Sequence, residues 1–170
     1  SSEIYTVDEL QEQIANFASS MAEKLRKQKS VATEMVVFAY TNRFKENAPQ
    51  TYSNGLISFT TPTSNQRQIV ADAVQVTQRI FKNGYGYKKA GVIATKIIPA
   101  GEVMHSLFED TAAAEREQKI TSTLDSINAT FGKGTIKLAV QGSGKIKSAS
   151  DNQSPHYTTR WSDIPKVSVK

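Results

Sequence analysis

The chain has 170 residues, a hydrophobic content of 38%, no cysteine and a formal net charge of +5. This length allows one domain, or a domain of about 100 residues with an appendage. The missing cysteine excludes disulfides, thiolate catalysis and cysteine-based zinc sites and fits a reducing cytosol, and without a run of 18 apolar residues we expect no membrane span. Because the first residue is Ser1, we expect a processed chain or a piece of a longer protein.

The first half of the chain predicts a helix followed by two strands. Thr6 and Glu9 have the spacing of a capping box, and apolar residues then recur every three or four positions as far as Leu25. Two β-rich runs follow, at 31–44 and 52–61, the second with Asn54-Gly55 as a turn or bulge.

A second helix and a third strand complete the first domain. Thr63 and Gln66 again have capping-box spacing, and the helix that follows ends at Asn83-Gly84. The last strand covers 87–98. The order helix, strand, strand, helix, strand predicts an α+β fold, a small antiparallel sheet with both helices on one face.

The remaining residues predict a smaller C-terminal extension. Residues 112–131 have a helical apolar stripe, 135–140 are a candidate short strand, and polar loop-like residues follow. Sixty residues cannot easily bury a core alone, so we expect the extension to pack against the first domain or a partner. The predicted division is 1–103, a connecting peptide 104–110, and 111–170.

The charges are unevenly distributed. Residues 111–170 carry nine Lys or Arg residues against five acidic ones, and no residue between Asp72 and Glu102 is acidic. A window of one charge sign attracts a polyanion such as nucleic acid. The alternative is that these cations only keep the chain soluble.

No pattern predicts a catalytic or metal site. Two-metal phosphoryl transfer needs carboxylates from separate strands, whereas Asp8-Glu9 falls in the first turn of a predicted helix, where acids favour the helix dipole. The glycine-rich stretch 84–86 precedes a strand, so it lacks the helix N-terminus of a phosphate loop.

The strand at 87–96 predicts a surface for phosphate contacts. If side chains alternate strictly, Ala90, Val92 and Ala94 pack under the helices, and Lys89 and Gly91 lie on the open face with Ile93 and Thr95. Small residues there would let a sugar–phosphate backbone approach main-chain N–H groups. The alternative is an ordinary solvated strand.

Five segments together carry a pattern: 56–63, 83–92, 124–128, 132–135 and the closing segment 154–161, Ser-Pro-His-Tyr-Thr-Thr-Arg-Trp. In the same order, they resemble the C-terminal part of UmuC-type catalytic subunits of bacterial DNA polymerase V, which are Y-family polymerases. The first two are similar to segments of the family's little-finger domain, 124–128 and 132–135 are similar to its C-terminal motifs, and the closing segment matches best. The palm, fingers and thumb that precede the little finger are missing.

The resemblance implies the DNA-binding C-terminal region of an error-prone translesion polymerase of the SOS type, located in the cytoplasm. Its first domain would be a little finger that grips the phosphates of template–primer DNA. The chain itself would carry no cofactor and no catalysis, whereas the parent polymerase would use Mg²⁺. The expected phosphate contacts are Lys88, Lys89, Arg43, Lys45 and Lys96.

The resemblance also implies protein partners. Residues 104–110 occupy the place of the family's sliding-clamp peptide, Gln-Leu-x-Leu-Phe, in which Leu107 and Phe108 match while Met104 and His105 depart. In the closing segment, three side chains are expected to stack on one another, to fold back on 135–140, or to contact a UmuD-type accessory subunit or a recombinase filament. These are Tyr157, Arg160 and Trp161.

Two other functions stay open on the sequence alone. The first is a free-standing basic α+β module that binds nucleic acid by stacking bases on Phe38, Tyr40 and Tyr52. The second is a protein-interaction module that uses Leu107-Phe108 and the Trp161 segment.

Overall fold

The computed structural model describes residues 3–45, 47–102 and 111–142. The main elements confirm the predicted α+β fold and its order. They are α1 (Val7–Lys27), β1 (Ser30–Thr41), β2 (Tyr52–Thr63), α2 (Gln66–Ile80), β3 (Tyr87–Pro99) and α3 (Thr111–Phe131), with short 3₁₀ turns η1 (Ala100–Glu102) and η2 (Ala139–Gln141).

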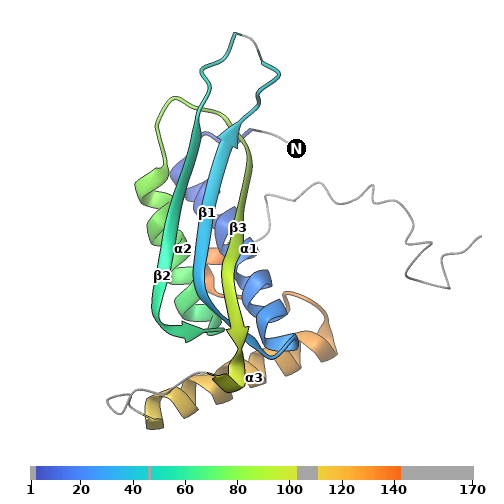
Figure 1. Ribbon diagram of the computed structural model, residues 1–170. Coiled ribbons are helices and arrows are strands. Elements are labelled where there is room, and N and C mark those ends of the chain that lie inside the picture. The colour runs from blue at the N-terminus through green and yellow to red at the C-terminus, as the bar shows by residue number, and fades with distance from the viewer. Residues whose placement is uncertain (1–2, 46, 103–110, 143–170) are drawn as a thin grey trace, which may run out of the picture.

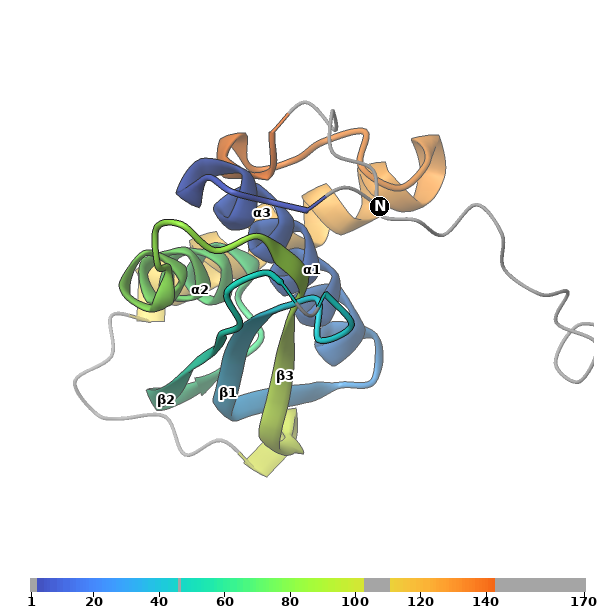
Figure 2. The same cartoon turned by 90° about the horizontal axis from the view of Figure 1, so that it is seen from above.

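The three strands form one antiparallel sheet in the order β2-β1-β3. Helices α1 and α2 lie side by side on one face of this sheet (Figures 1 and 2). No other element of the described chain covers the opposite face, which we call the open face.

The hydrophobic core lies between the helices and the sheet. Leu10 and Ile14 of α1 and Met35 and Val37 of β1 are fully buried, and burial of each such side chain contributes about 1.5–3 kcal/mol. On β3, the expected core side chains do pack against this cluster: Ala90, Val92 and Ala94.

The helix starts differ in how well the sequence predicts them. The hydroxyl of Thr6 accepts a hydrogen bond from the backbone N–H of Glu9, which confirms Thr6 as the cap of α1. The predicted cap of α2 at Thr63 is wrong, because Thr63 still belongs to β2. Asn65 caps α2 instead, since its side-chain oxygen accepts from the N–H groups of the first helical turn.

The predicted turn or bulge at Asn54-Gly55 is also wrong. Both residues lie within β2 and pair regularly with Phe38 and Val37 of β1. A Cβ atom on Gly55 would overlap a methyl group of Val76. Glycine is therefore needed here for the close approach of α2 to the sheet, and not for a turn.

Helix α3 crosses the ends of α1 and α2 (Figure 1). At the end of α1, the Arg26 guanidinium donates two hydrogen bonds of 2.6 Å to the Asp125 carboxylate of α3 and one of 2.9 Å to the Ser64 carbonyl. Nearer the start of α1, Asn16 and Gln141 exchange hydrogen bonds. These contacts join the described part of the extension to the sheet domain.

The predicted strand at 135–140 is wrong. The backbone of Ile136 exchanges two hydrogen bonds with the side-chain amide of Asn128, at 3.0 and 2.9 Å, and the chain then enters η2. A strand would need a neighbouring strand to bond these groups. Here the Asn128 side chain takes that place.

Candidate nucleic-acid interface

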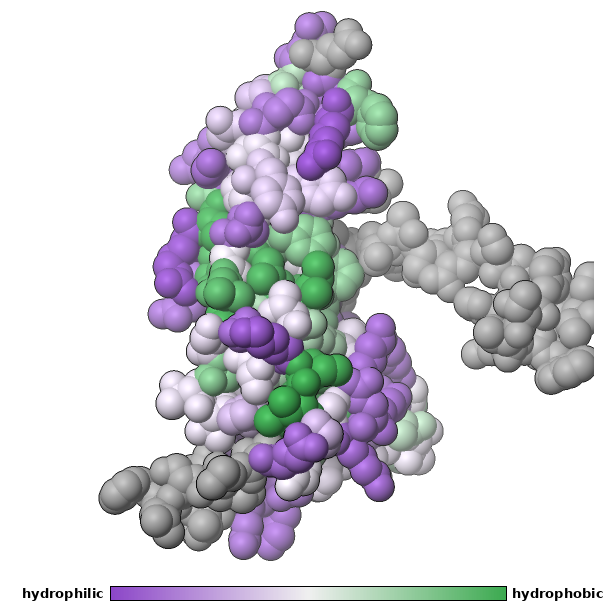
Figure 3. Space-filling view, in the orientation of Figure 1, coloured by the Kyte–Doolittle hydropathy of each residue, from purple (hydrophilic) through white to green (hydrophobic). Residues whose placement is uncertain are grey.

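The middle of the open face is apolar. Val36 of β1 lies between its register partners Leu56 on β2 and Ile93 on β3. Leu56 is 60% exposed and Ile93 is 52% exposed, and Figure 3 shows the hydrophobic side chains gathered across the sheet. Glu34, two residues before Val36 on β1, and its ion-pair partner Lys96 lie next to this apolar row.

Aromatic rings lie on the open face next to this apolar row, at the end of the sheet where the β1–β2 loop begins. We call this the hairpin end. The ring centroids of Phe38 and Tyr40 are 6.1 Å apart with an interplanar angle of 20°. Tyr52, across the strand pair from Tyr40, is also 6.1 Å away. The Arg43 guanidinium lies 5.7 Å from the centre of the Tyr40 ring, which is a cation–π distance.

The expectation that Gly91 leaves the main chain open to a phosphate is wrong. Gly91 is buried, and a Cβ atom built on it would lie 2.8 Å from Cζ of the Phe38 ring. The ring therefore extends from β1 across to β3 and fills the space above Gly91. Gly91 provides a place for the ring instead of an approach for DNA.

A β-bulge sets the direction of the basic residues on β3. Tyr40 pairs with Lys89 and Thr41 pairs with Tyr87, so Lys88 is an additional residue on β3. Strict alternation fails at this point. Because of the bulge, Tyr87 is buried while Ala90 still packs against the core, and Lys89 stays exposed on the open face.

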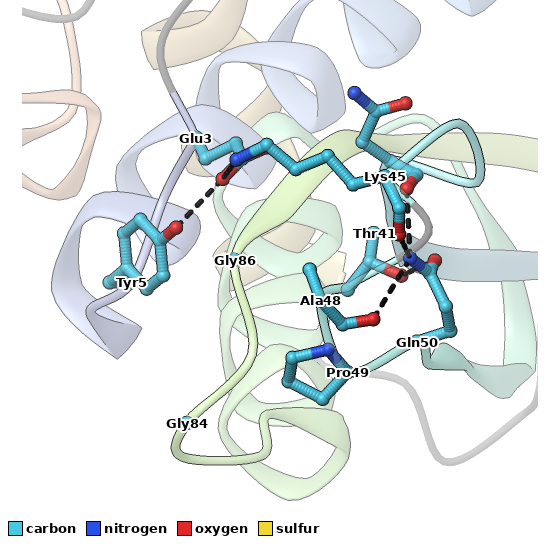
Figure 4. Close-up of a pocket in the computed structure, with 10 residues that line it drawn as sticks. Glu3, Tyr5, Thr41, Lys45, Ala48, Pro49, Gln50, Gly84 and Gly86 are labelled. Carbon is cyan, nitrogen blue, oxygen red and sulfur yellow. Dashed lines mark hydrogen bonds and ion pairs between the residues drawn. The ribbon is translucent and has the colours of Figure 1, made fainter.

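Lys45 belongs to a small hydrogen-bonded network (Figure 4). Its ammonium lies 2.9 Å from Oε2 of Glu3, and the same oxygen accepts a hydrogen bond of 2.7 Å from the Tyr5 hydroxyl. The network borders a cavity of about 50 Å³ whose lining includes Gln50 and Gly86. The pKa of Glu3 is lowered, mainly by the hydrogen bond from the Tyr5 hydroxyl and next by the hydrogen bond from Lys45. The bond to Glu3 raises the pKa of Tyr5 and of Lys45.

This network predicts a pH-dependent contribution to stability. Because folding lowers the pKa of Glu3, the contribution is present above its ordinary value of 4.5 and is lost as pH falls through the lowered value. We expect Glu3→Gln to melt below the unsubstituted protein at neutral pH, and the two melting temperatures to converge in acid. A constant difference at every pH, measured by circular dichroism, would contradict this.

The predicted phosphate-binding residues divide into two groups. Arg43 and Lys45 follow the end of β1, and Lys88 and Lys89 lie at the start of β3, so all four are at the hairpin end. Lys96 lies toward the opposite end, where it forms an ion pair of 2.7 Å with Glu34.

The other predicted site residues, Met104, Leu107, Phe108, Tyr157, Arg160 and Trp161, lie outside the described residues. Within the described ranges, no three His, Asp or Glu side chains come together as a metal ion would require. Among the described residues, no helix is both long enough and apolar enough to cross a membrane.

Comparisons with known proteins confirm the resemblance to UmuC-type proteins. The profile of the impB/mucB/samB family C-terminal domain matches residues 1–107, and a domain of unknown function (DUF4113) matches residues 118–167. Protein UmuC of Salmonella typhimurium is 33% identical over 161 residues, which cover 94% of this chain and 38% of that protein. Protein SamB of the same species is 32% identical over 169 residues, which cover 98% of this chain and 39% of that protein.

A protein named DNA polymerase IV, from Desulfatibacillum aliphaticivorans, is 23% identical over 137 residues, which cover 80% of this chain and 33% of that protein. The chain spans less than two fifths of the length of the curated UmuC and SamB proteins that it matches. The chain belongs to the impB/mucB/samB family, and its residues 1–107 are that family's C-terminal domain.

Proposed function

We propose that this chain is the DNA-binding C-terminal region of a Y-family translesion polymerase, and that the hairpin end of its open face grips the phosphates of template–primer DNA. The relatives named UmuC and DNA polymerase IV support the polymerase assignment. The observation that carries the DNA-binding role is the gathering of cations at one end of a three-stranded sheet: Arg43, Lys45, Lys88 and Lys89.

These cations do not contribute equally. Lys89 is exposed beside the aromatic rings, and Arg43 lies over one of them. Lys45 already faces the Glu3 carboxylate at 2.9 Å, and Lys96 faces Glu34. A phosphate near Lys45 or Lys96 would also meet a carboxylate, so Lys89 and Arg43 supply more of the attraction than Lys45 or Lys96.

The mechanism is electrostatic and geometric. Contacts to phosphates fix the position of a duplex and carry little sequence information. A sheet that holds the duplex by its backbone supports an active site that does not require ideal base shape, as damaged DNA demands. Bond formation belongs to the polymerase parts outside this chain.

The test is a charge reversal at the bulge. We expect the double variant Lys88→Glu/Lys89→Glu to bind duplex DNA at least about tenfold more weakly. The slope of log K against log salt should fall in magnitude by about 0.9 for each phosphate that the variant no longer neutralises. Fluorescence anisotropy with labelled duplexes of unrelated sequence measures both quantities.

The matched control reverses two exposed lysines of the C-terminal extension, Lys119→Glu/Lys133→Glu, which changes the net charge by the same amount. We expect this control to keep most of the affinity. An equal loss of affinity in both variants would show that the effect depends only on net charge. A loss of affinity that depends on the duplex sequence would contradict phosphate gripping.

A further inference from the structure

Gripping a duplex by its phosphates makes no use of the aromatic rings on the open face. We propose that Phe38, Tyr40 and Tyr52 form a platform on which bases of an unpaired DNA strand stack, next to the duplex held by the cations. This inference rests on the proposed function and adds a second kind of DNA contact to the same face.

The position of the rings indicates that they do not serve the core. All three lie on the face of the sheet opposite the helices, and the hydrophobic core and the side chains packed on it do not include them. Tyr52 is 55% exposed. Stacking on a base would remove from water aromatic surface that folding leaves exposed.

The rings are also held in place before any ligand binds. Phe38 occupies the space above Gly91, and the Tyr40 ring lies within 20° of the plane of the Phe38 ring. Tyr52 adjoins Tyr40 from the neighbouring strand. Ring side chains fixed on a sheet lose little further conformational freedom on binding.

The charges beside the rings favour a nucleic-acid strand as the occupant. Arg43 lies 5.7 Å from the Tyr40 ring centre, and Lys89 is the register partner of Tyr40 on β3. Proteins that bind single strands combine cations that follow the backbone with rings that stack on bases. Inside a duplex the base faces are covered by neighbouring base pairs, so an unpaired strand is the form that can use this platform.

The experiment compares three labelled DNAs with the 170-residue chain: a blunt duplex, the same duplex with a single-stranded template overhang, and the same overhang built from abasic units. The abasic overhang keeps every phosphate and lacks the bases. We expect the normal overhang to raise affinity by about fivefold or more, as one stacked base does, and the abasic overhang to lose that gain.

Two variants locate the effect. Tyr40→Leu/Tyr52→Leu is expected to lose the gain from the overhang while keeping the salt slope for the blunt duplex, because both substitutions leave every cation of the hairpin end in the chain. Gly91→Ala is expected to reduce the gain as well, because the added methyl group displaces the Phe38 ring without removing it. Leu56→Ala, which changes an exposed apolar residue of the same face, is the matched control and should keep the gain.

The outcomes separate the two proposals. Equal affinity for normal and abasic overhangs overturns the stacking platform, as does a gain that persists in Tyr40→Leu/Tyr52→Leu. Blunt-duplex binding that persists in either case leaves phosphate gripping in place. Absence of binding to any of the three DNAs overturns both. Because the abasic comparison uses the unsubstituted chain, it stays decisive even if a variant fails to fold.

Discussion

Tyr87→Ala is expected to lower the free energy of unfolding by about 3–5 kcal/mol, as removal of a buried aromatic side chain does. The Tyr87 side chain is 1% exposed, and its ring centre lies 5.6 Å from that of Phe81. Its hydroxyl accepts a hydrogen bond of 3.0 Å from the backbone N–H of Lys82, and its main chain exchanges two hydrogen bonds with Ile4. Removal of this ring leaves a cavity where β3 begins.

Tyr87→Phe is the control for this variant, because it keeps the ring and removes only the hydroxyl that accepts the hydrogen bond from the Lys82 N–H. We expect it to cost about 1 kcal/mol. Urea unfolding followed by circular dichroism measures both variants. Equal stability of the Ala and Phe variants would show that the ring does not hold the start of β3.

The effect of Tyr87 extends to the DNA-binding proposal. Tyr87 directly precedes the bulge at Lys88, so the burial of its ring fixes where the bulge forms and where Lys89 points. We therefore expect Tyr87→Ala to weaken duplex binding even at temperatures where it is folded, whereas Tyr87→Phe should bind normally.

The sequence predicted the elements that have one buried face. Helix α1 spaces its apolar residues at three and four positions, and the structure buries that face. Strand β1 was predicted from a run rich in β-branched and aromatic residues, and its alternate residues Met35, Val37 and Ala39 are buried. The fold class follows from the order of these elements, so it was predictable without tertiary information.

Two of the errors concern glycines that accommodate a side chain from a distant part of the chain. Gly55 is small because of Val76 on α2, and Gly91 is small because of Phe38 on β1. A glycine read locally indicates a turn or an exposed main chain. Only the strand register and the helix packing show that each glycine accommodates another side chain.

The bulge left a signal in the sequence. Tyr87 and Ala90 are three residues apart, so a regular strand cannot place both against the helices. An extra residue between them resolves the conflict, and the structure places it at Lys88. The ion pairs of Lys45 with Glu3 and of Lys96 with Glu34 had no such signal, because their partners are distant in sequence.

Arg26→Ala is expected to lower the free energy of unfolding by about 2–3 kcal/mol. Breaking a fully buried ion pair costs about 3–5 kcal/mol, and the partial exposure of Arg26 and Asp125, at 16% and 33%, reduces this value. The substitution leaves the Asp125 carboxylate and the Ser64 carbonyl without their guanidinium donor. Helix α3 then loses its charged attachment to the end of α1.

A double-mutant cycle separates this attachment from general effects of the substitutions. With Asp125→Asn as the second change, we expect a coupling energy of at least about 1.5 kcal/mol, since a bidentate guanidinium–carboxylate pair is stronger than a single ion pair. The ion pair of Lys27 with Glu23, one helical turn apart on α1, provides the matched control. Lys27 is 74% exposed, and exposed pairs contribute at most about 1 kcal/mol. If the Arg26–Asp125 coupling is as small as that of the control pair, other contacts hold α3 on the sheet domain, among them the ion pair of Arg67 on α2 with Glu117 on α3. A large coupling instead shows that this ion pair helps to hold together the two regions that the family profiles match. In that case Arg26→Ala should increase hydrogen exchange in α3 more than in β1.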